Sequence, residues 1–205
     1  MIDNSLKTVL DDKKISEALI KQSVSKLSGN QRLYILSDHS DIRKPYSSKL
    51  ENNGKVRALN GSIVNDYTTL NSVILNEHKK ELTLSNITVF SNKDEDFITK
   101  KELDAYHKNT IKDSQRKAEI QQKIEDKSYI NMQVTLEKHL KDQSDAFKKV
   151  NPDISLFHVH DRAADSIDYL EFVKNKLGDE AVVRVKKSRN SQQTKINPET
   201  NKKVH

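Results

Sequence analysis

Two aspartates that follow short apolar runs are the residues of this sequence best placed to do chemistry. Asp38 follows the run at 33–36, and Asp161 follows the run at 154–160. Short apolar runs of this kind are typical of buried strands, whereas Asp is rare inside strands. Carboxylates at the ends of neighbouring strands could share one or two Mg²⁺ ions, which require hard oxygen ligands. Such a metal centre would act on the attacking and leaving oxygens of a phosphoryl transfer.

Each aspartate also has a purely structural interpretation. An Asp at the position of Asp38 commonly opens a turn, because its side chain can accept a hydrogen bond from the backbone two residues further on. Asp161 and Asp165 precede a helical pattern, and negative charge is favourable at the start of a helix. The residues alone leave these alternatives open.

Other arrangements of catalytic or ligating residues are weaker or missing. His158 and His160 form an H-x-H pair of the kind that can bind zinc, but no third ligand lies nearby, so we interpret them as core residues or as supports of the carboxylates. The sequence has no Cys, which excludes thiolate metal sites and disulfides. It also lacks a glycine-rich phosphate loop and a G-x-S-x-G motif. Aromatic residues, at 5%, are too sparse for a base-stacking platform.

Composition restricts the class of protein. The 205 residues suffice for one domain or a domain with a large insertion, and 32% charged against 34% hydrophobic residues predicts a modest core. Four Gly and three Pro argue against a turn-dense sandwich or barrel. No apolar stretch is long enough for a membrane span and the N-terminus lacks a secretory signal, so we expect a cytoplasmic protein. The net charge of +6 suits an anionic partner such as nucleic acid, or simply a solvated lysine-rich surface.

The first half of the chain is predicted to form a helix and three antiparallel strands. Apolar spacing indicates a helix at 12–28, followed by a strand at 32–38. The polar segment 39–61, with several basic residues, is predicted to be a long loop. Two β-rich runs, at 63–77 and 81–91, are close enough along the chain to form a hairpin.

The second half is predicted to be largely helical before it returns to the sheet. Two charged helices are expected at about 99–127 and 130–149, and the first can bury only a thin apolar stripe. They are followed by a strand at 154–160, a helix at 163–177 and a strand at 180–186. A strand–helix–strand unit of this kind predicts a parallel pair.

This order predicts an α/β fold with a mixed five-stranded sheet flanked by helices, the ribonuclease H-like arrangement. The first and fourth strands would be neighbours, which would place Asp38 beside Asp161. The predicted organisation has an N-terminal helical segment at 1–31, a catalytic domain at 32–190 with a helical insertion at about 92–150, and a polar basic tail at 191–205.

Four stretches resemble the catalytic domain of bacterial insertion-sequence DDE transposases of the cut-and-paste group. They are DHSDIRKPYSSKLE at 38–51, GKVR at 54–57, DYTTLNSVIL at 66–75 and HDRAADSIDYLEF at 160–172. They occur in the expected order and cover most of 32–190, and the first and last are the specific ones.

The resemblance implies hydrolysis of a DNA phosphodiester and strand transfer in DNA transposition. Asp38 and Asp161 correspond to the first two acids of a triad that binds Mg²⁺ or Mn²⁺, and Arg162 and Asp165 to residues that support the second acid. The implied partners are double-stranded DNA of transposon ends and, in the full-length family, a second copy of the chain. The basic residues predicted to contact DNA are Arg43, Lys44, Lys55, Arg57, Arg184, Lys186, Lys187 and Arg189.

The sequence also departs from this family. Asp66 stands where the family usually has Gly, and no Glu matches the third acid, which belongs to a later helix. We therefore expect a C-terminally incomplete catalytic domain with little or no activity of its own. One alternative is a catalytically inactive DNA-binding or dimerising remnant that interferes with an intact transposase. Another is a helical adaptor built on residues 99–149.

Overall fold

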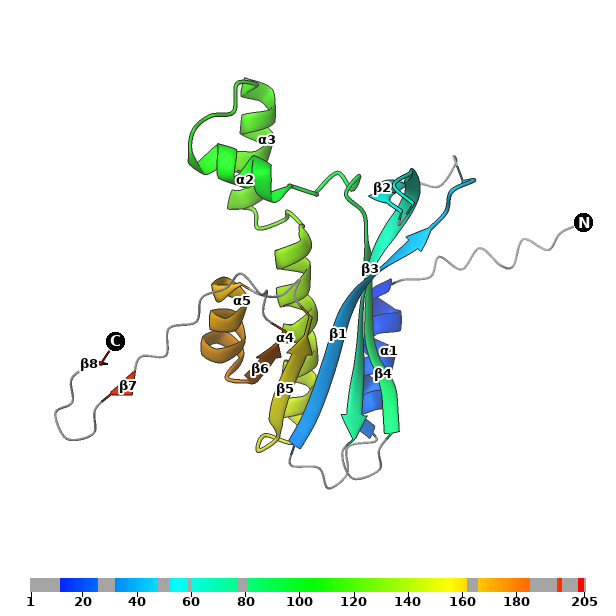
Figure 1. Ribbon diagram of the computed structural model, residues 1–205, viewed down its shortest axis with the longest axis vertical. Coiled ribbons are helices and arrows are strands. Elements are labelled where there is room, and N and C mark those ends of the chain that lie inside the picture. Colours follow the sequence, from blue (N-terminus) through cyan, green and yellow to red (C-terminus); the bar gives the residue numbers. More distant parts are fainter. Residues whose placement is uncertain are drawn as a thin grey trace, which may run out of the picture.

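The computed structural model describes most of the chain between residues 12 and 184 (Figure 1). The described part is an α/β protein with one mixed, open sheet of six strands and helices packed beside it. Helix α1 (Asp12–Ser25) precedes the first strand, close to the prediction. The described residues are 12–25, 32–47, 52–58, 60–76, 81–161, 166–184, 195–196 and 203–204.

The sheet has the order β2-β3-β1-β5-β6, and β4 pairs with β3 beyond the end of β2. Strand β3 is antiparallel to β1, β2 and β4, whereas β1, β5 and β6 are parallel to one another. The hairpin, the parallel pair and the adjacency of the first and fourth predicted strands are therefore confirmed. The strands are β1 (Arg32–Arg43), β2 (Gly54–Arg57), β3 (Ile63–Asn76), β4 (Glu81–Phe90), β5 (Ser155–His160) and β6 (Glu180–Val183).

The predicted loop at 39–61 is wrong, because β1 continues to Arg43 and the loop contains β2. Residues 39–43 pair with β3 in a regular register that ends with Arg43 opposite Asp66. The backbone hydrogen bonds of this ladder outweigh the weak strand propensity of the polar residues. Asp38 therefore lies inside a strand and does not open a turn, and the sheet has six strands instead of five.

The predicted helix at 99–127 consists of two helices, α2 (Lys100–His107) and α3 (Ser114–Glu125). Asn109, after α2, adopts a positive φ of 55° that ends the helical path. Asp113 then begins α3, because its side chain accepts hydrogen bonds from the backbone N–H groups of Gln115 and Arg116. Helix α4 (Met132–Val150) agrees with the prediction, with Asn131 as its N-cap.

The helix after β5 begins later than predicted. Helix α5 (Ile167–Glu171) starts after Ser166, whose hydroxyl accepts a hydrogen bond from the Tyr169 N–H at 3.2 Å. It continues as the π-helix η3 (Phe172–Leu177), which ends at Gly178 with φ 69°. The interpretation of Asp161 as a helix cap is therefore wrong, since Ser166 has that role.

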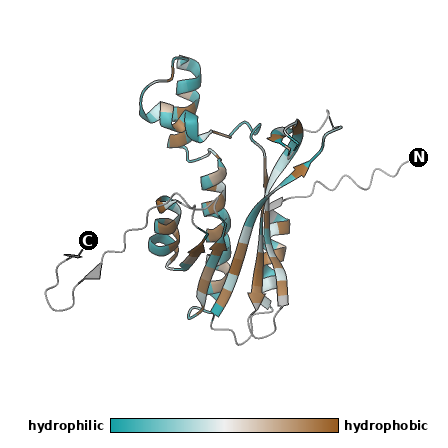
Figure 2. Cartoon of the chain, viewed as in Figure 1, coloured by the Kyte–Doolittle hydropathy of each residue, from teal (hydrophilic) through white to brown (hydrophobic). Residues whose placement is uncertain are grey.

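The core lies on one face of the sheet. In β5 and in the first half of β1, up to Ser37, every second residue is buried, whereas the residues between them are only half-buried. Side chains of α4, together with Val24 of α1 and with Tyr169 and Val173, pack on the buried set. Figure 2 shows the hydrophobic residues concentrated in the sheet and the adjacent helix faces, while α2 and α3 are largely hydrophilic.

Little of the predicted basic tail at 191–205 is described. Two short strands, β7 (Lys195–Ile196) and β8 (Lys203–Val204), pair antiparallel there. Within the described ranges, no helix combines the length and apolar character needed to cross a membrane.

Candidate metal centre

The middle of β1 and the carboxyl end of β5 bring Asp38 and Asp161 to adjacent positions. The two strands are parallel, and Ser37 lies opposite His160 in their register. Asp38 directly follows Ser37, Asp161 directly follows His160, and both aspartates are exposed. Neighbouring strands in a sheet lie about 4.8 Å apart. Two carboxylates that are distant in the sequence are therefore neighbours at this edge of the core.

A third oxygen-bearing side chain lies on the other side of Asp38. Asn71 of β3 is directly opposite Asp38 in the antiparallel register. Its Nδ2 donates to Thr69 Oγ1 at 3.0 Å, so its carbonyl oxygen remains the ligating end of the amide. Asn71, Asp38 and Asp161 thus form a row across three adjacent strands. Asn71 was not among the predicted site residues, because its position depends on the register of β3 against β1.

Both aspartates affect the pKa of His39. Burial lowers the pKa of His39, while the negative charges of Asp38 and Asp161 raise it. Both carboxylates therefore lie within electrostatic range of one imidazole. The backbone N–H of His39 also donates to Asp38 Oδ1 at 2.9 Å, which orients that carboxylate. His39 was not predicted as a site residue either, although it directly follows Asp38.

The paired histidines of β5 belong to the core, one of the two interpretations that the sequence allowed. His158 and His160 are both buried, and His158 Nε2 contacts Asp179 at 2.8 Å. The His160 ring packs edge-on against Tyr169, with ring centroids 5.0 Å apart. Burial, with smaller contributions from His158 and His39, lowers the pKa of His160 to about 3. His160 is therefore neutral at ordinary pH, and it directly precedes Asp161 as the last residue of β5.

Four of the predicted DNA-contacting residues lie together on one projection, which we call the β-arm (residues 39–47, 52–58 and 60–68). Strand β2 pairs with the first half of β3, and that half pairs with the outer half of β1. The four are exposed; Arg43 also contacts Asp41 at 3.5 Å, and Lys55 Nζ donates to Asn65 Oδ1 at 2.6 Å. The four residues are Arg43, Lys44, Lys55 and Arg57.

The other predicted site residues are only partly described. Arg184 is exposed directly after β6, and its N–H donates to the His160 carbonyl at 3.1 Å, which places its backbone near Asp161. Five predicted residues lie outside the described residues: Arg162, Asp165, Lys186, Lys187 and Arg189.

The donor set at Asp38 and Asp161 suits Mg²⁺ or Mn²⁺ better than zinc. Across the described ranges, no group of three or more His, Asp or Glu side chains is arranged to hold a metal ion. Structural zinc requires about four protein ligands in a tetrahedron. Mg²⁺, by contrast, is usually held by one or two carboxylates together with water and substrate phosphates. Two adjacent exposed carboxylates fit that requirement.

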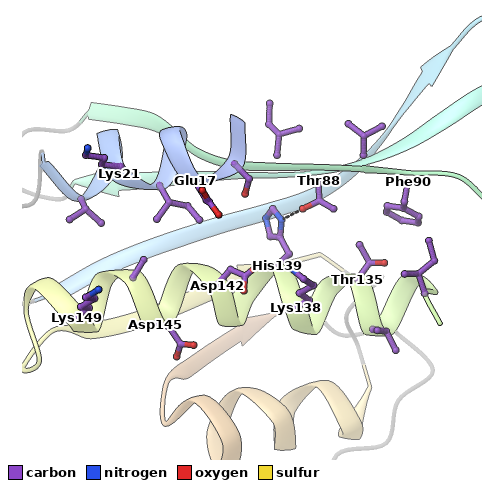
Figure 3. A pocket seen from close by; sticks show the side chains of 18 of the residues that line it. Glu17, Lys21, Thr88, Phe90, Thr135, Lys138, His139, Asp142, Asp145 and Lys149 are labelled. Carbon is purple, nitrogen blue, oxygen red and sulfur yellow. Dashed lines mark hydrogen bonds and ion pairs between the residues drawn. The ribbon is translucent and has the colours of Figure 1, made fainter. Parts of the chain in front are cut away.

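A groove of about 1020 Å³ lies elsewhere, between α1 and α4 and over β4 (Figure 3). His139 points from α4 towards Thr88 in this view, and its Nδ1 lies 2.7 Å from Thr88 Oγ1. Its other ring nitrogen, Nε2, lies 2.7 Å from Ser72 Oγ. Both nitrogens are thus engaged, and neither Asp38 nor Asp161 lines the groove. The groove is separate from the candidate metal centre.

No protein-family model matches this chain, and no curated protein is significantly similar to it. Its function has to be inferred from its residues and their geometry.

Proposed function

We propose that this chain is a ribonuclease H-like domain of the DDE transposase type, in which Asp38 and Asp161 bind Mg²⁺ or Mn²⁺ at a DNA phosphodiester. The observation that carries the proposal is the parallel pairing of β1 and β5, which sets the two aspartates side by side. The strand order is compatible with a ribonuclease H-like domain, because antiparallel β4, β3 and β1 are followed by parallel β5 and β6.

The chemistry divides between the metal and the protein. A bound divalent ion would stabilise charge on the phosphate and promote formation of the attacking hydroxide. Asp38 and Asp161 hold the cation, and the Asn71 amide oxygen adds a neutral donor beside Asp38. Basic side chains of the β-arm hold the neighbouring phosphates. In a transposase of this type, hydrolysis would be followed by strand transfer between transposon ends in the bacterial cytoplasm, with the transposase acting as a dimer.

Metal binding tests the proposal directly. We expect Asp38→Asn and Asp161→Asn each to weaken Mn²⁺ binding at least about tenfold, because each removes one of two anionic ligands. Electron paramagnetic resonance of free Mn²⁺ during titration of the full chain measures this. Asp104→Asn is the matched control, since Asp104 is an exposed acid in α2. Wild-type affinity in both site variants would refute the proposal.

Nicking of DNA is expected to be weak or absent, because the described residues provide two carboxylates at this site and no third. The assay incubates the full chain with transposon-end DNA and Mg²⁺ or Mn²⁺. Robust nicking that disappears in Asp38→Asn and Asp161→Asn would overturn the expected inactivity and identify both residues as catalytic.

The second candidate is a DNA-binding or dimerising remnant that interferes with an intact transposase. The cluster of exposed basic residues on the β-arm favours it, because phosphate contacts need no catalytic centre. For this candidate too we expect duplex binding that weakens steeply with salt. Arg43→Gln with Lys44→Gln should lower the slope of log K against log salt concentration by about 0.9 for each phosphate that the variant no longer neutralises. Binding of wild type without a steep salt dependence would contradict both candidates.

A further inference from the structure

The α2–α3 hairpin (residues 99–126) projects beyond the end of the sheet towards which β1 and β4 run (Figure 1). Strands β1 and β4 are both antiparallel to β3, so both end at this edge. Helix α4 begins at this end and returns towards the start of β5. The hairpin therefore emerges at the end of the sheet towards which β1, β4 and β5 run, where Asp161 directly follows β5 and Asp38 lies in the middle of β1.

The hairpin is an ordered unit with its own supports. Ile98 and Ile120 are fully buried, and a bridge between Phe97 and Ile130 closes its base. Arg116 contacts Glu102 at 2.9 Å, which joins α3 to α2. These contacts fix the positions of the exposed residues on the hairpin.

The connection from β4 to the hairpin, residues 91–98, also touches the β-arm. Asn52 Nδ2 donates to Asp94 Oδ1 at 3.3 Å, and Asn92 Nδ2 donates to the Lys55 carbonyl at 3.3 Å. The contact is close: a Cβ atom at Gly54 would lie 2.8 Å from Asn92 Oδ1. The segment that leads from β4 to the hairpin is therefore in contact with β2 of the β-arm.

Positive charge exceeds negative charge in the first part of the hairpin, although residues 99–126 as a whole contain seven Lys or Arg and six Asp or Glu. Residues 99–118 contain six Lys or Arg and three Asp or Glu. Glu102 is engaged by Thr99 and Arg116, and Asp113 caps α3. Four exposed lysines have no ion pair or side-chain hydrogen bond within the described part of the chain: Lys100, Lys101, Lys108 and Lys112.

Two of these lysines oppose the stability of their own helix. Lys100 and Lys101 directly follow the N-cap Thr99 of α2. The helix dipole places partial positive charge at this end, so cations there are unfavourable. Folding therefore does not explain their presence, and an external anion would.

We propose that the α2–α3 hairpin is a second phosphate-contacting arm for duplex DNA. Together with the β-arm it would hold a duplex across the edge at which Asp38 and Asp161 lie. This inference rests on the proposed function. It adds a specific set of contacts to the DNA phosphates, made by residues outside the four stretches that resemble DDE transposases.

The test measures binding of the full chain to fluorescent duplex DNA over a range of salt concentrations. Lys100→Gln with Lys101→Gln should reduce the slope of log K against log salt concentration by roughly 2, from about 0.9 per phosphate contact. Lys149→Gln with Lys176→Gln is the matched control, because these exposed lysines lie in the last turns of α4 and η3, away from the hairpin. The control should retain the wild-type slope.

The outcomes distinguish failure of the hairpin proposal from failure of the proposed function. A wild-type slope in Lys100→Gln with Lys101→Gln, or an equal reduction in the control, would overturn the hairpin arm. A reduced slope in Arg43→Gln with Lys44→Gln would still support the proposed function in that case. Thermal unfolding at the wild-type temperature or above is expected for the Lys100/Lys101 variant, because it removes two unfavourable charges. Weaker binding by this variant would then reflect the missing lysine–phosphate interactions of a folded protein.

Discussion

Replacement of Asp179 by Ala is expected to lower the free energy of unfolding by about 3–5 kcal/mol, the range for breaking a buried ion pair from one side. The Asp179 carboxylate is 3% exposed and follows Gly178 at the end of η3. It lies 2.8 Å from His158 Nε2 and accepts a hydrogen bond from Ser144 Oγ at 2.7 Å. Lys148 Nζ forms an ion pair with it at 2.5 Å. Its removal would leave three polar groups, from β5 and α4, without their partner.

The pKa of Asp179 shows that its carboxylate is well compensated. Burial raises this pKa, but hydrogen bonds from His158, Lys148 and Ser144 together lower it by more than burial raises it. The net shift of the pKa is therefore downward. Because the pKa is lower in the folded state, the carboxylate stabilises the protein at pH values above about 3.9, the pKa of an Asp in the unfolded chain. That contribution is lost as the pH falls from there through the folded pKa. At neutral pH the full contribution is present.

Urea unfolding followed by circular dichroism at neutral pH would measure the effect. Asp104→Ala, which removes an exposed carboxylate, should change stability by less than about 0.5 kcal/mol. Asp179→Asn retains one acceptor of similar shape and should fall between the two. A loss below about 1 kcal/mol for Asp179→Ala would show that the network contributes little.

Much of the sheet could be predicted because its signals are local. The apolar runs of β3, β4 and β5 stand out by residue type, and the short connection between β3 and β4 requires a hairpin. A strand–helix–strand unit with a short helix allows little except the parallel pairing of β5 and β6. The adjacency of the first and fourth predicted strands is not a local signal, and it was predicted from the ribonuclease H-like strand order.

The outer half of β1 and all of β2 could not be predicted, because only distant pairing stabilises them. Residues 39–43 are polar, and they adopt strand conformation because 66–70 lies alongside. The division of residues 99–127 into two helices was missed for another reason. Asn109 and Asp113 are ordinary residues on a polar helix surface until one adopts a positive φ and the other an N-cap geometry.

Some residues of the candidate site could likewise be identified from the sequence, whereas others could not. Asp38 and Asp161 follow apolar runs, so residue type alone made them candidates. Asn71 lies beside them only through the register of β3 against β1, which depends on the pairing of whole strands. Ser37 and Ser72, which look like surface residues in sequence, form a buried contact of 2.5 Å between β1 and β3. Polar residues on a buried face therefore gave no usable signal before the strand pairing was known.

Acidification from pH about 7.5 to 5 is expected to cost roughly 2 kcal/mol of stability through His139 alone. His139 is 1% exposed, and its two ring nitrogens contact Ser72 and Thr88. Burial lowers its pKa to about 3, with smaller electrostatic contributions from His160, His39, Lys138 and His158. In the unfolded chain the pKa of a histidine is about 6.5.

The sign follows from proton binding. Between pH about 6.5 and 3 the unfolded chain binds a proton at His139 that the folded protein does not, so stability falls as the pH falls. Each pH unit in this window costs about 1.4 kcal/mol. His139→Gln is the informative variant, because the amide offers a donor and an acceptor but does not titrate. Urea unfolding at both pH values should show a less stable variant at pH about 7.5 whose pH dependence is weaker by one proton. Equal pH dependence in the two proteins would contradict this prediction. It would mean that burial against β3 and β4 does not keep His139 neutral in the folded protein.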